Sequence, residues 1–324
     1  MSTRRCREWF RFLTACFCGL GFAVAGVAAE PEAPRPLHRI TPDTPQALRE
    51  LFRSAPGVLP IVSAHRGGAA ANYPENCLET FEHTLQHTWA LLEVDPRLAS
   101  DGVVLHHDPT LERTTTGTGV LTEHSLRQLR ALQLKDRAGS VTEFRLPTLD
   151  EAIEWARGKT VLVLDQKDVP LETRIAAIEA HEAEAFVMLI VPNFRDVAAC
   201  HDRNPNITME VMIPDRERMH RFDELGVPWE CVVPFVGHQP PEDRELYREL
   251  HARGVRCLIG TSRNLDRRLL SGEIDSLRPL QPQYRAFLDR GADLIETDLP
   301  IEVAQILYAD QTVPEAAAQI LRRD

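Results

Sequence analysis

Three histidines, an arginine and closely spaced carboxylates lie within fewer than fifty residues near the start of the predicted folded region. They occur in four segments: Ala64-His65-Arg66-Gly67-Gly68, Pro74-Glu75-Asn76, Glu93-Val94-Asp95 and His106-His107-Asp108. Hydrolysis of a phosphodiester requires groups of these types. The anionic phosphoryl group must be neutralised, a proton must leave the attacking oxygen, and another must reach the leaving alkoxide. The pattern therefore predicts metal-dependent phosphodiester chemistry.

Three acids are the predicted ligands of one divalent cation, Mg or Ca. Residues two apart on a strand face the same side, so Glu93 and Asp95 present two carboxylates to one point. Asp165, at the end of another predicted strand, completes the set of oxygen donors that a hard cation prefers. A solvated pair at a sheet edge would explain a Glu-x-Asp sequence alone, but the apolar strand residues and nearby histidines favour a metal site.

His65 and His107 are the predicted acid and base. Histidine titrates near neutrality, so one imidazole can accept a proton while the other donates one, provided that they lie on opposite sides of the phosphate. The residues alone leave open which histidine has which role. Glu75 and Asn76 are predicted to orient His65 or its loop. His106 is predicted to be structural, because it neighbours His107 on a strand and so points to the opposite face.

Arg66 and Lys167 are the predicted phosphate-binding cations. The guanidinium offers a planar fork to two phosphate oxygens, and the lysine offers a point charge. The alternative is that both form ion pairs with Glu75, Asp165 or Asp168. Two glycines directly after Arg66 favour binding, because they let the backbone approach a ligand closely.

Short apolar runs alternate with amphipathic stretches along the chain, a rhythm that predicts a parallel sheet. The eight predicted strands are residues 61–64, 91–94, 161–164, 186–191, 207–213, 231–235, 256–259 and 293–296. A further run at 103–106 follows residues 91–94 too closely for a parallel crossover. It is therefore predicted to form a hairpin that turns at Ser100-Asp101-Gly102.

Eight strands interleaved with helices over this length favour an α/β fold of the closed TIM (β/α)8 barrel type over an open sheet. The predicted helices are residues 78–88, 149–157, 171–183, 216–225, 243–253 and 283–290. Residues 109–147 hold the longest connection without a predicted strand. They are expected to form a short insertion over the barrel mouth.

The chain is predicted to have three parts. Residues 1–29 have a basic start, an uncharged apolar run and small residues at Val27-Ala28-Ala29, a pattern typical of a cleaved signal peptide. An uncleaved anchor is the alternative, but the apolar run is short of the ~20 residues that span a bilayer. Arg4-Arg5 leaves Sec and Tat export open. Residues 30–58 resemble an exposed Pro-rich leader, and 59–324 form the barrel domain, so an exported, periplasmic or extracellular protein is expected.

The charge excludes some classes of partner. Beyond residue 29 the chain has 33 basic and 47 acidic residues, and a nucleic-acid binder needs a basic face. A small-molecule substrate is expected, with no stable membrane span after cleavage and no protein partner predicted. Beyond residue 29 the cysteines are Cys77, Cys200, Cys231 and Cys257, whose spacing fits no zinc motif and favours buried thiols over one or two disulfides.

Taken together, these motifs resemble the glycerophosphodiester phosphodiesterase family, within the barrel superfamily of phosphatidylinositol-type phospholipases. The resemblance runs from Ile61 to Pro300. It rests on the segments above together with Leu146-Pro147-Thr148-Leu149, Asp165-Gln166-Lys167 and Thr297-Asp298-Leu299-Pro300. It implies hydrolysis of glycerophosphodiesters to sn-glycerol 3-phosphate and an alcohol, with His65 as proton acceptor and His107 as donor. The glycerol 2-hydroxyl or water could attack first.

Two departures from the family pattern keep other substrates open. Asp165 stands where the family usually has Glu, and an Asp at this position is similar to the sphingomyelinase D type lipases. The second departure is Ile259-Gly260-Thr261-Ser262-Arg263-Asn264, which stands where the family often has a Trp-Thr-x-Asn stretch. One alternative is therefore a lysophospholipase D or a sphingomyelinase D-like cyclising phospholipase, which would need an apolar patch at the barrel mouth. The other is a non-catalytic barrel that captures phosphodiesters.

Overall fold

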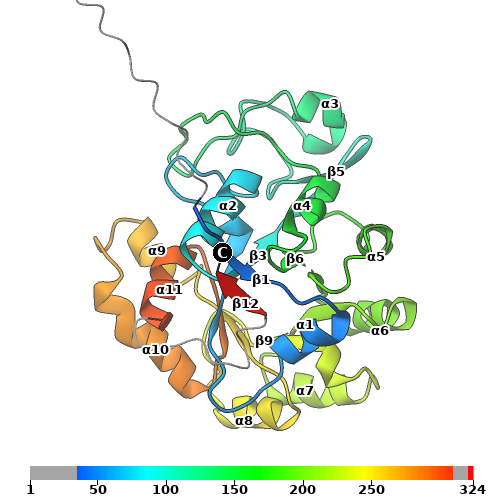
Figure 1. Cartoon of the computed structure of the whole chain (residues 1–324), viewed down its shortest axis with the longest axis vertical. Coiled ribbons are helices and arrows are strands. Elements are labelled where there is room, and N and C mark those ends of the chain that lie inside the picture. The colour runs from blue at the N-terminus through cyan, green and yellow to red at the C-terminus, as the bar shows by residue number, and fades with distance from the viewer. Residues whose placement is uncertain (1–34, 309–319, 324) are drawn as a thin grey trace, which may run out of the picture. The chain divides into compact units, whose positions relative to one another are not determined.

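A closed barrel of eight parallel strands forms the centre of the protein (Figure 1). The computed structural model describes residues 35–308 and 320–323. The barrel strands are β2 (Ile61–Ala64), β3 (Ala90–Val94), β6 (Leu162–Leu164), β7 (Val187–Ile190), β8 (Thr208–Met212), β9 (Val232–Phe235), β10 (Leu258–Gly260) and β11 (Leu294–Thr297). Around the barrel they follow the order β10-β11-β2-β3-β6-β7-β8-β9, and β9 pairs with β10 to close it. The predicted TIM barrel is confirmed.

Helices cover the outside of the barrel, as Figure 1 shows. They are α2 (Leu78–His87), α4 (Leu149–Ala156), α5 (Leu171–Ala180), α6 (Phe194–Arg203), α7 (Arg216–Asp223), α8 (Glu245–Ala252), α9 (Leu265–Leu270), α10 (Gln281–Arg290) and α11 (Pro300–Tyr308). Short 3-10 turns lie at η3 (Trp229–Cys231) and η4 (Arg278–Leu280). α4 illustrates why they form. Thr148 and Glu151 make a capping box, and Leu149, Ala152, Ile153 and Ala156 bury one face.

The hairpin predicted after the second barrel strand is present. β4 (Pro96–Ala99) pairs antiparallel with β5 (Gly102–Leu105), and Ser100 and Asp101 form the turn between them. The Asp101 carboxylate accepts a hydrogen bond of 2.6 Å from the backbone of Leu126, at the start of α3 (Leu126–Leu129). The hairpin is thereby tied to the insertion that follows it.

The insertion, residues 109–147, has a small apolar core of its own. Beside α3 it contains the 3-10 turn η2 (Leu121–Glu123). Leu111, Leu121, Leu129 and Leu134 pack there against Val104 of the hairpin. Apolar burial of this kind holds a long connection in one place, so that its polar residues can line a site.

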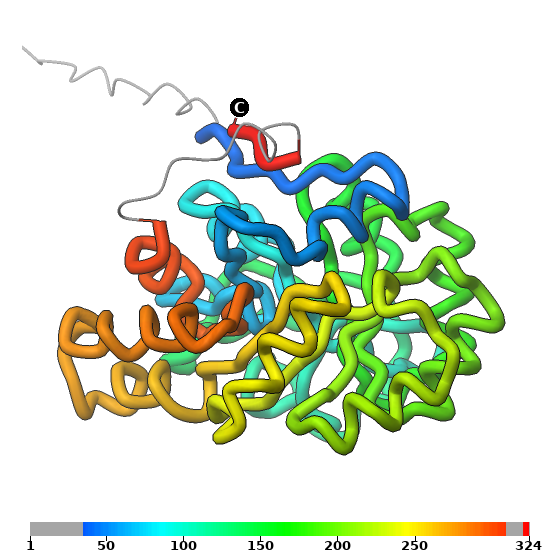
Figure 2. The backbone as a smooth tube through the Cα atoms, turned by 90° about the horizontal axis from the view of Figure 1, so that it is seen from below, coloured from blue at the N-terminus to red at the C-terminus, as the bar shows by residue number. Residues whose placement is uncertain are grey.

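The amino-terminal end of the barrel is closed by chain segments from both ends of the sequence. β1 (His38–Ile40) pairs antiparallel with β12 (Leu321–Arg323), and Figure 2 shows these two segments side by side. α1 (Pro45–Leu51) lies in the same region, and one apolar cluster joins Ile40, Leu48 and Phe52 to inward-facing strand residues such as Ile61.

The exposed character predicted for residues 30–58 is wrong over their described part. Leu37, Ile40, Leu48 and Phe52 are buried, because apolar residues alternate with the prolines that suggested a linker. Pro45 is the first residue of α1, where its missing N–H costs no hydrogen bond. The predicted signal peptide lies outside the described residues.

Two further observations concern the described part of the chain only. No helix there is long and apolar enough to cross a membrane. Cys77, Cys200, Cys231 and Cys257 are all buried free thiols, as their spacing favours.

A tight turn follows β2 and carries the first two residues of the predicted site. It is the 3-10 turn η1 (His65–Gly67), in which Arg66 has a φ of 54°. Gly67 and Gly68 have φ values of 82° and 88°. A Cβ on Gly67 would lie 2.2 Å from the ring of Phe81, and one on Gly68 would lie 2.4 Å from Pro300. The two glycines are therefore required for the turn to pack.

Gly67→Ala tests this requirement. The new Cβ meets the Phe81 ring in a left-handed backbone, so we expect a loss of about 3 kcal/mol in the free energy of unfolding, measured by urea denaturation. Gly158→Ala is the matched control, because Gly158 has a φ of 68° but nothing within 4 Å of its would-be Cβ. It should cost only about 1 kcal/mol. Equal losses in both variants would contradict the steric account.

Candidate active site

Three carboxylates converge at the carboxyl ends of two neighbouring strands. Glu93 lies on β3, Asp95 directly follows β3, and Asp165 directly follows β6. One oxygen of each lies within 4.8 Å of an oxygen of the other two. Burial and the charge of Asp95 raise the pKa of Glu93 well above its usual value. Oxygen donors at this spacing fit a hard divalent cation.

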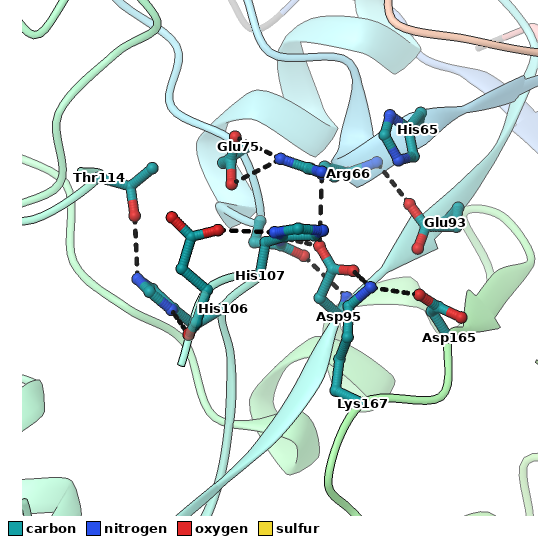
Figure 3. A network of polar contacts seen from close by, with 12 residues as sticks. His65, Arg66, Glu75, Glu93, Asp95, His106, His107, Thr114, Asp165 and Lys167 are labelled. Carbon is teal, nitrogen blue, oxygen red and sulfur yellow. Dashed lines mark hydrogen bonds and ion pairs between the residues drawn. The ribbon is translucent and has the colours of Figure 1, made fainter. Parts of the chain in front are cut away.

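Asp95 is fully buried and is held by two neighbours. The Asn76 amide donates a hydrogen bond of 2.6 Å to Asp95 Oδ2, and its carbonyl accepts one of 2.9 Å from the Asp95 backbone. Lys167 Nζ lies 2.9 Å from Asp95 Oδ1 and also contacts Asp165 (Figure 3). Burial opposes ionisation of Asp95, but Lys167 and the other nearby donors outweigh it and lower the pKa. Lys167 thus lies within the predicted cation site.

Arg66 faces the same carboxylates from η1. Its backbone N–H donates a hydrogen bond of 2.7 Å to Glu93 Oε2, and its Nε lies 3.8 Å from Asp95 Oδ2. Its Nη1 lies 3.2 Å and 3.1 Å from the two oxygens of Glu75. Glu75 therefore orients the Arg66 side chain, and the remaining guanidinium N–H groups can bind a phosphate.

His65 is oriented by Asp298, which the sequence analysis placed in a motif but not in the site. His65 Nδ1 lies 2.7 Å from Asp298 Oδ1. Burial disfavours the imidazolium, but the hydrogen bond to Asp298 and the charges of Glu93 and Glu296 outweigh it and raise the pKa of His65 to about 10. His65 is therefore charged at neutral pH in the protein without a cation.

His107 belongs to a second chain of contacts. Its Nδ1 lies 2.7 Å from Asp108 Oδ1, and Arg113 Nη2 lies 3.0 Å from the same oxygen. Arg113 also contacts Glu75, at 2.7 Å between Nη2 and Oε1. Burial lowers the pKa of His107 despite the nearby Asp108, so this imidazole is neutral. Arg113 and Asp108 thus connect the supports of His107 and Arg66.

His106 points away from the other site residues, as Figure 3 shows. Its Nε2 lies 2.9 Å from Thr114 Oγ1 and its Nδ1 lies 2.8 Å from the Asp108 carbonyl. Both contacts fix the loop that carries His107. The geometry agrees with the structural role predicted for His106.

Two cavities meet at His65, Arg66 and Asp298, which line both of them. The first, which we call the metal-side cavity, has a volume of about 450 Å³ and is also lined by Glu93, Asp165, His107 and Lys167. The second, which we call the insertion-side cavity, has a volume of about 390 Å³. Its other lining residues include Glu75, Arg113, Lys135 and Arg137. A phosphate beside Arg66 would therefore have room for one ester arm in each cavity.

Two further acids line the metal-side cavity. Glu210 lies on β8 and Glu296 on β11, and their residues are only 4% and 7% exposed. Burial and the charge of Glu296 raise the pKa of Glu210. Burial also raises the pKa of Glu296, although the charge of His65 opposes this shift. Within residues 35–308 and 320–323, no hydrogen bond or ion pair involves either carboxylate.

The nine predicted site residues thus gather around one centre. Arg66 and Lys167 form the ion pairs with Glu75 and Asp165 that were the alternative to phosphate binding, and the Asn76 side chain holds Asp95 instead of His65. Sequence reasoning missed Asp298, Asp108, Arg113, Glu210 and Glu296. A signal existed for two of these, since Glu296-Thr297-Asp298 repeats the Glu-x-Asp pattern of the predicted metal site at the end of another strand. Glu210 and Arg113 stand alone among apolar or polar neighbours and offered no comparable signal.

A second group of possible metal donors lies at the opposite end of the barrel. His251, Cys257 and Asp293 have ligand atoms within 4.8 Å of one another. Asp293 already accepts hydrogen bonds from His251, at 2.8 Å, and from the Cys257 backbone, at 2.7 Å. Through these bonds the three residues connect α8 to the starts of β10 and β11, which is a structural role.

Comparison with known proteins agrees with this geometry. A model of the glycerophosphoryl diester phosphodiesterase family matches residues 65–224. A crystal structure of a glycerophosphoryl diester phosphodiesterase from Parabacteroides distasonis matches this chain with a TM-score of 0.83 and 37% sequence identity. The match covers 88% of this chain and 99% of that one. A glycerophosphodiester phosphodiesterase of Caldanaerobacter subterraneus is 34% identical over 105 residues, which span 32% of this chain and 43% of that protein.

A more distant structural relative supports the fold only. It is an Oleispira antarctica phosphodiesterase in complex with the product sn-glycerol-3-phosphate. It has a TM-score of 0.57 and is 21% identical, and the match covers 76% of this chain and 96% of that one.

Asp298→Asn tests the support of His65. Removing the carboxylate removes a hydrogen bond and a negative charge that favour the imidazolium, so we expect the pKa of His65 to fall from about 10 toward its ordinary value. NMR titration of the chelator-treated protein measures it, with the His65 signal assigned by its loss in His65→Asn. Asp293→Asn is the control, because it removes the partner of His251 instead. An unchanged His65 pKa in Asp298→Asn would contradict the account.

Proposed function

The chain belongs to the glycerophosphodiester phosphodiesterase family and is a phosphoric diester hydrolase, and on that premise we propose that it converts glycerophosphodiesters to sn-glycerol 3-phosphate and an alcohol with a divalent cation, Mg or Ca, bound. The observation that carries the proposal is the convergence of Glu93, Asp95 and Asp165 beside two imidazoles and Arg66.

Arg66 and Lys167 bind and neutralise the phosphate in this proposal. Arg66 is held by Glu75 at the junction of the two cavities, and Lys167 is held by Asp95 and Asp165. When bound by the three acids, the cation supplies Lewis-acid stabilisation of the charge that develops on the phosphoryl oxygens. The positions of both side chains are fixed before substrate arrives, so little reorganisation is needed in the transition state.

His65 and His107 carry out the proton transfers. One accepts a proton from the attacking hydroxyl, which is water or the glycerol 2-hydroxyl, and the other donates a proton to the leaving alkoxide as its bond to phosphorus breaks. Without a cation His65 is the charged imidazole, the reverse of the acceptor role that the family resemblance implies. Glu93 is one cause of that charge, and a cation held by Glu93 would offset it. We therefore assign proton acceptance to His65 in the cation-loaded site, and proton donation to the protonated form of His107, which the charges of Asp108 and Asp95 favour.

The structure favours a water-soluble diester over an acylated substrate. A lysophospholipase D would need a contiguous apolar patch near the mouth. Among the described residues, the large apolar side chains that are exposed are Val120, Val141 and Leu270. Leu270 lines a third cavity beside Asp298, and none of the three lines either cavity beside His65. A purely binding protein would not need the paired imidazoles with their separate carboxylate partners.

We also propose that the enzyme is exported, a proposal supported by the basic, apolar and small-residue pattern of residues 1–29 alone. In an exported enzyme, deacylated phospholipid headgroups outside the cytoplasm would be the available substrates.

Turnover of glycerophosphoethanolamine tests the proposed reaction. The assay follows sn-glycerol 3-phosphate through a coupled dehydrogenase, with and without chelator. We expect turnover only with the cation present, and we expect His65→Asn and His107→Asn each to lower kcat by roughly 10²-fold to 10⁴-fold. His220→Asn, at an exposed helix position, is the control and should leave kcat unchanged. Turnover that survives chelation, or full activity in either histidine variant, would contradict the proposal.

Cation binding can be tested without turnover. We expect Mg or Ca to raise the Tm of the chelated protein, equivalent to about 2.7 kcal/mol of stabilisation at a hundred times Kd, as followed by scanning calorimetry. Glu93→Gln should abolish this gain, while the chelated variant should be no less stable than the chelated wild type because repulsion by Asp95 is relieved. Glu217→Gln, an exposed acid on α7, should retain the gain. A rise in Tm with the cation that is as large in Glu93→Gln as in wild type would contradict the proposed cation site.

A further inference from the structure

A buried carboxylate outside the two cavities has no role in the reaction described above. Asp266 is the second residue of α9 and is fully buried. α9 follows the loop after β10 and lies on the same side of the barrel as α10 and α11 (Figure 1). Asp266 lines neither cavity beside His65. A buried carboxylate is costly unless hydrogen bonds or charges compensate it, so its position requires an explanation.

Four uncharged groups converge on the Asp266 carboxylate. The Tyr284 hydroxyl, on α10, donates a hydrogen bond of 2.5 Å to Oδ1. The backbone N–H of Asp298 donates one of 2.8 Å to Oδ2, and the Thr297 hydroxyl lies at the same distance from that oxygen. The Thr261 hydroxyl lies 3.0 Å from Oδ2. Two of the four groups belong to consecutive residues at the end of β11, so Asp266 fixes the backbone at that point.

The backbone that Asp266 fixes carries the partner of His65. Asp298 bonds to Asp266 through its N–H, and its side-chain Oδ1 lies 2.7 Å from His65 Nδ1. Thr297 Oγ1 also accepts a bond of 3.0 Å from the backbone N–H of Leu299, so the chain is held on both sides of Asp298. Asp266 therefore determines where the Asp298 carboxylate lies, and with it the orientation of the imidazole.

The loop after β10 takes part in the same set of bonds. Thr261 belongs to the segment 259–264, which departs from the family pattern. Its backbone N–H and its hydroxyl lie 2.8 Å and 3.0 Å from the Glu296 carbonyl. The Asn264 amide donates a hydrogen bond to the carbonyl of His238, in the loop after β9. These bonds join the carboxyl ends of three neighbouring strands, β9, β10 and β11.

Packing alone does not account for an acid at position 266. An apolar side chain of similar volume would fill buried space without the cost of desolvating a carboxylate. That cost is evident in the pKa of Asp266, which burial raises although Tyr284 and the other donors oppose the rise. The buried hydroxyl of Thr297 and the N–H that follows it need an acceptor, because a buried donor without one is costly. The acid therefore serves the chain segment that carries Asp298.

We propose that Asp266 is a positioning residue for proton transfer at His65, because it fixes the backbone of Asp298, whose carboxylate orients the imidazole. Asp266 itself touches neither substrate nor reacting atoms. This inference rests on the proposed function, since it concerns a proton-transfer group of the same reaction. It predicts a loss in the chemical step alone, because Arg66 and Lys167, the proposed phosphate-binding residues, are held by other side chains.

Substitution of Asp266 tests this role in glycerophosphoethanolamine hydrolysis. We expect Asp266→Ala to lower kcat by roughly tenfold to a hundredfold with little change in KM, because a misplaced imidazole slows proton transfer without weakening phosphate binding. Asp266→Asn keeps an acceptor oxygen for the Asp298 N–H and should restore most of kcat. Asp293→Ala is the matched control, since it removes a carboxylate that accepts one side-chain and one backbone bond far from the site. Wild-type kcat in Asp266→Ala, or an equal loss in Asp293→Ala, would overturn the inference.

A double variant shows whether Asp266 acts through Asp298. In Asp298→Ala the carboxylate that Asp266 positions is absent, so adding Asp266→Ala should lower kcat little further. A general structural role would add its full loss to that of Asp298→Ala, and this additive result would contradict the proposed positioning.

Tyr284→Phe replaces Asp266→Ala if circular dichroism shows that the alanine variant does not fold. It keeps the aromatic ring and removes only the hydroxyl that bonds to the Asp266 carboxylate. It should lower kcat in wild type, by less than Asp266→Ala, but not in Asp298→Ala. A single Tyr284→Phe variant with wild-type kcat would then reject the proposal.

NMR separates this inference from the proposed reaction, because it needs no turnover. The imidazole proton between His65 Nδ1 and Asp298 should give a resonance at low field, assigned by its loss in His65→Asn and Asp298→Ala. We expect this resonance in wild type, Asp266→Asn and Asp293→Ala, and its loss or a shift to higher field in Asp266→Ala. If wild type hydrolyses no diester but shows this pattern, only the proposed reaction fails. If Asp266→Ala leaves the resonance unchanged, the positioning role is wrong whatever the turnover.

Discussion

The concentration of negative charge at the barrel mouth is the constraint on which the rest of the site depends. One oxygen each of Glu93, Asp95 and Asp165 lies within 4.8 Å of the other two, and burial makes their mutual repulsion stronger than it would be in water. Arg66 and Lys167 offset part of it. In the proposed reaction a divalent cation offsets the rest, and this repulsion would be the source of the site's affinity for metal.

The groups around this centre support one another through shared partners. Glu75 contacts both Arg66 and Arg113, and Arg113 also holds Asp108, the partner of His107. The insertion contributes Arg113, and its own apolar core fixes its position on the hairpin. Arg66, the proposed phosphate-binding residue, and His107, one of the two proposed proton-transfer groups, are therefore positioned by a single network. Asp298, at the end of β11, holds the other imidazole from outside that network.

Much of this could be predicted from the sequence, for physical reasons. Strand order and the hairpin follow from the spacing of apolar runs, because a parallel crossover needs a minimum length. The pair Glu93 and Asp95 follows from the two-residue period of a strand. The contact of Asp298 with His65 and that of Arg113 with Glu75 could not be predicted, because they span 233 and 38 residues along the chain. The described part of the leader was misjudged, since Pro45 begins α1 while Leu37, Ile40, Leu48 and Phe52 are buried.

The most direct test of the central claim is a crystal structure of the protein with Mn²⁺ or Ca²⁺, in which anomalous scattering locates the ion. The account predicts one site with oxygen ligands from Glu93, Asp95 and Asp165, on the side of the barrel that carries His65 and His107. An ion bound elsewhere, such as at His251, Cys257 and Asp293, with the three acids left unbound, would contradict it.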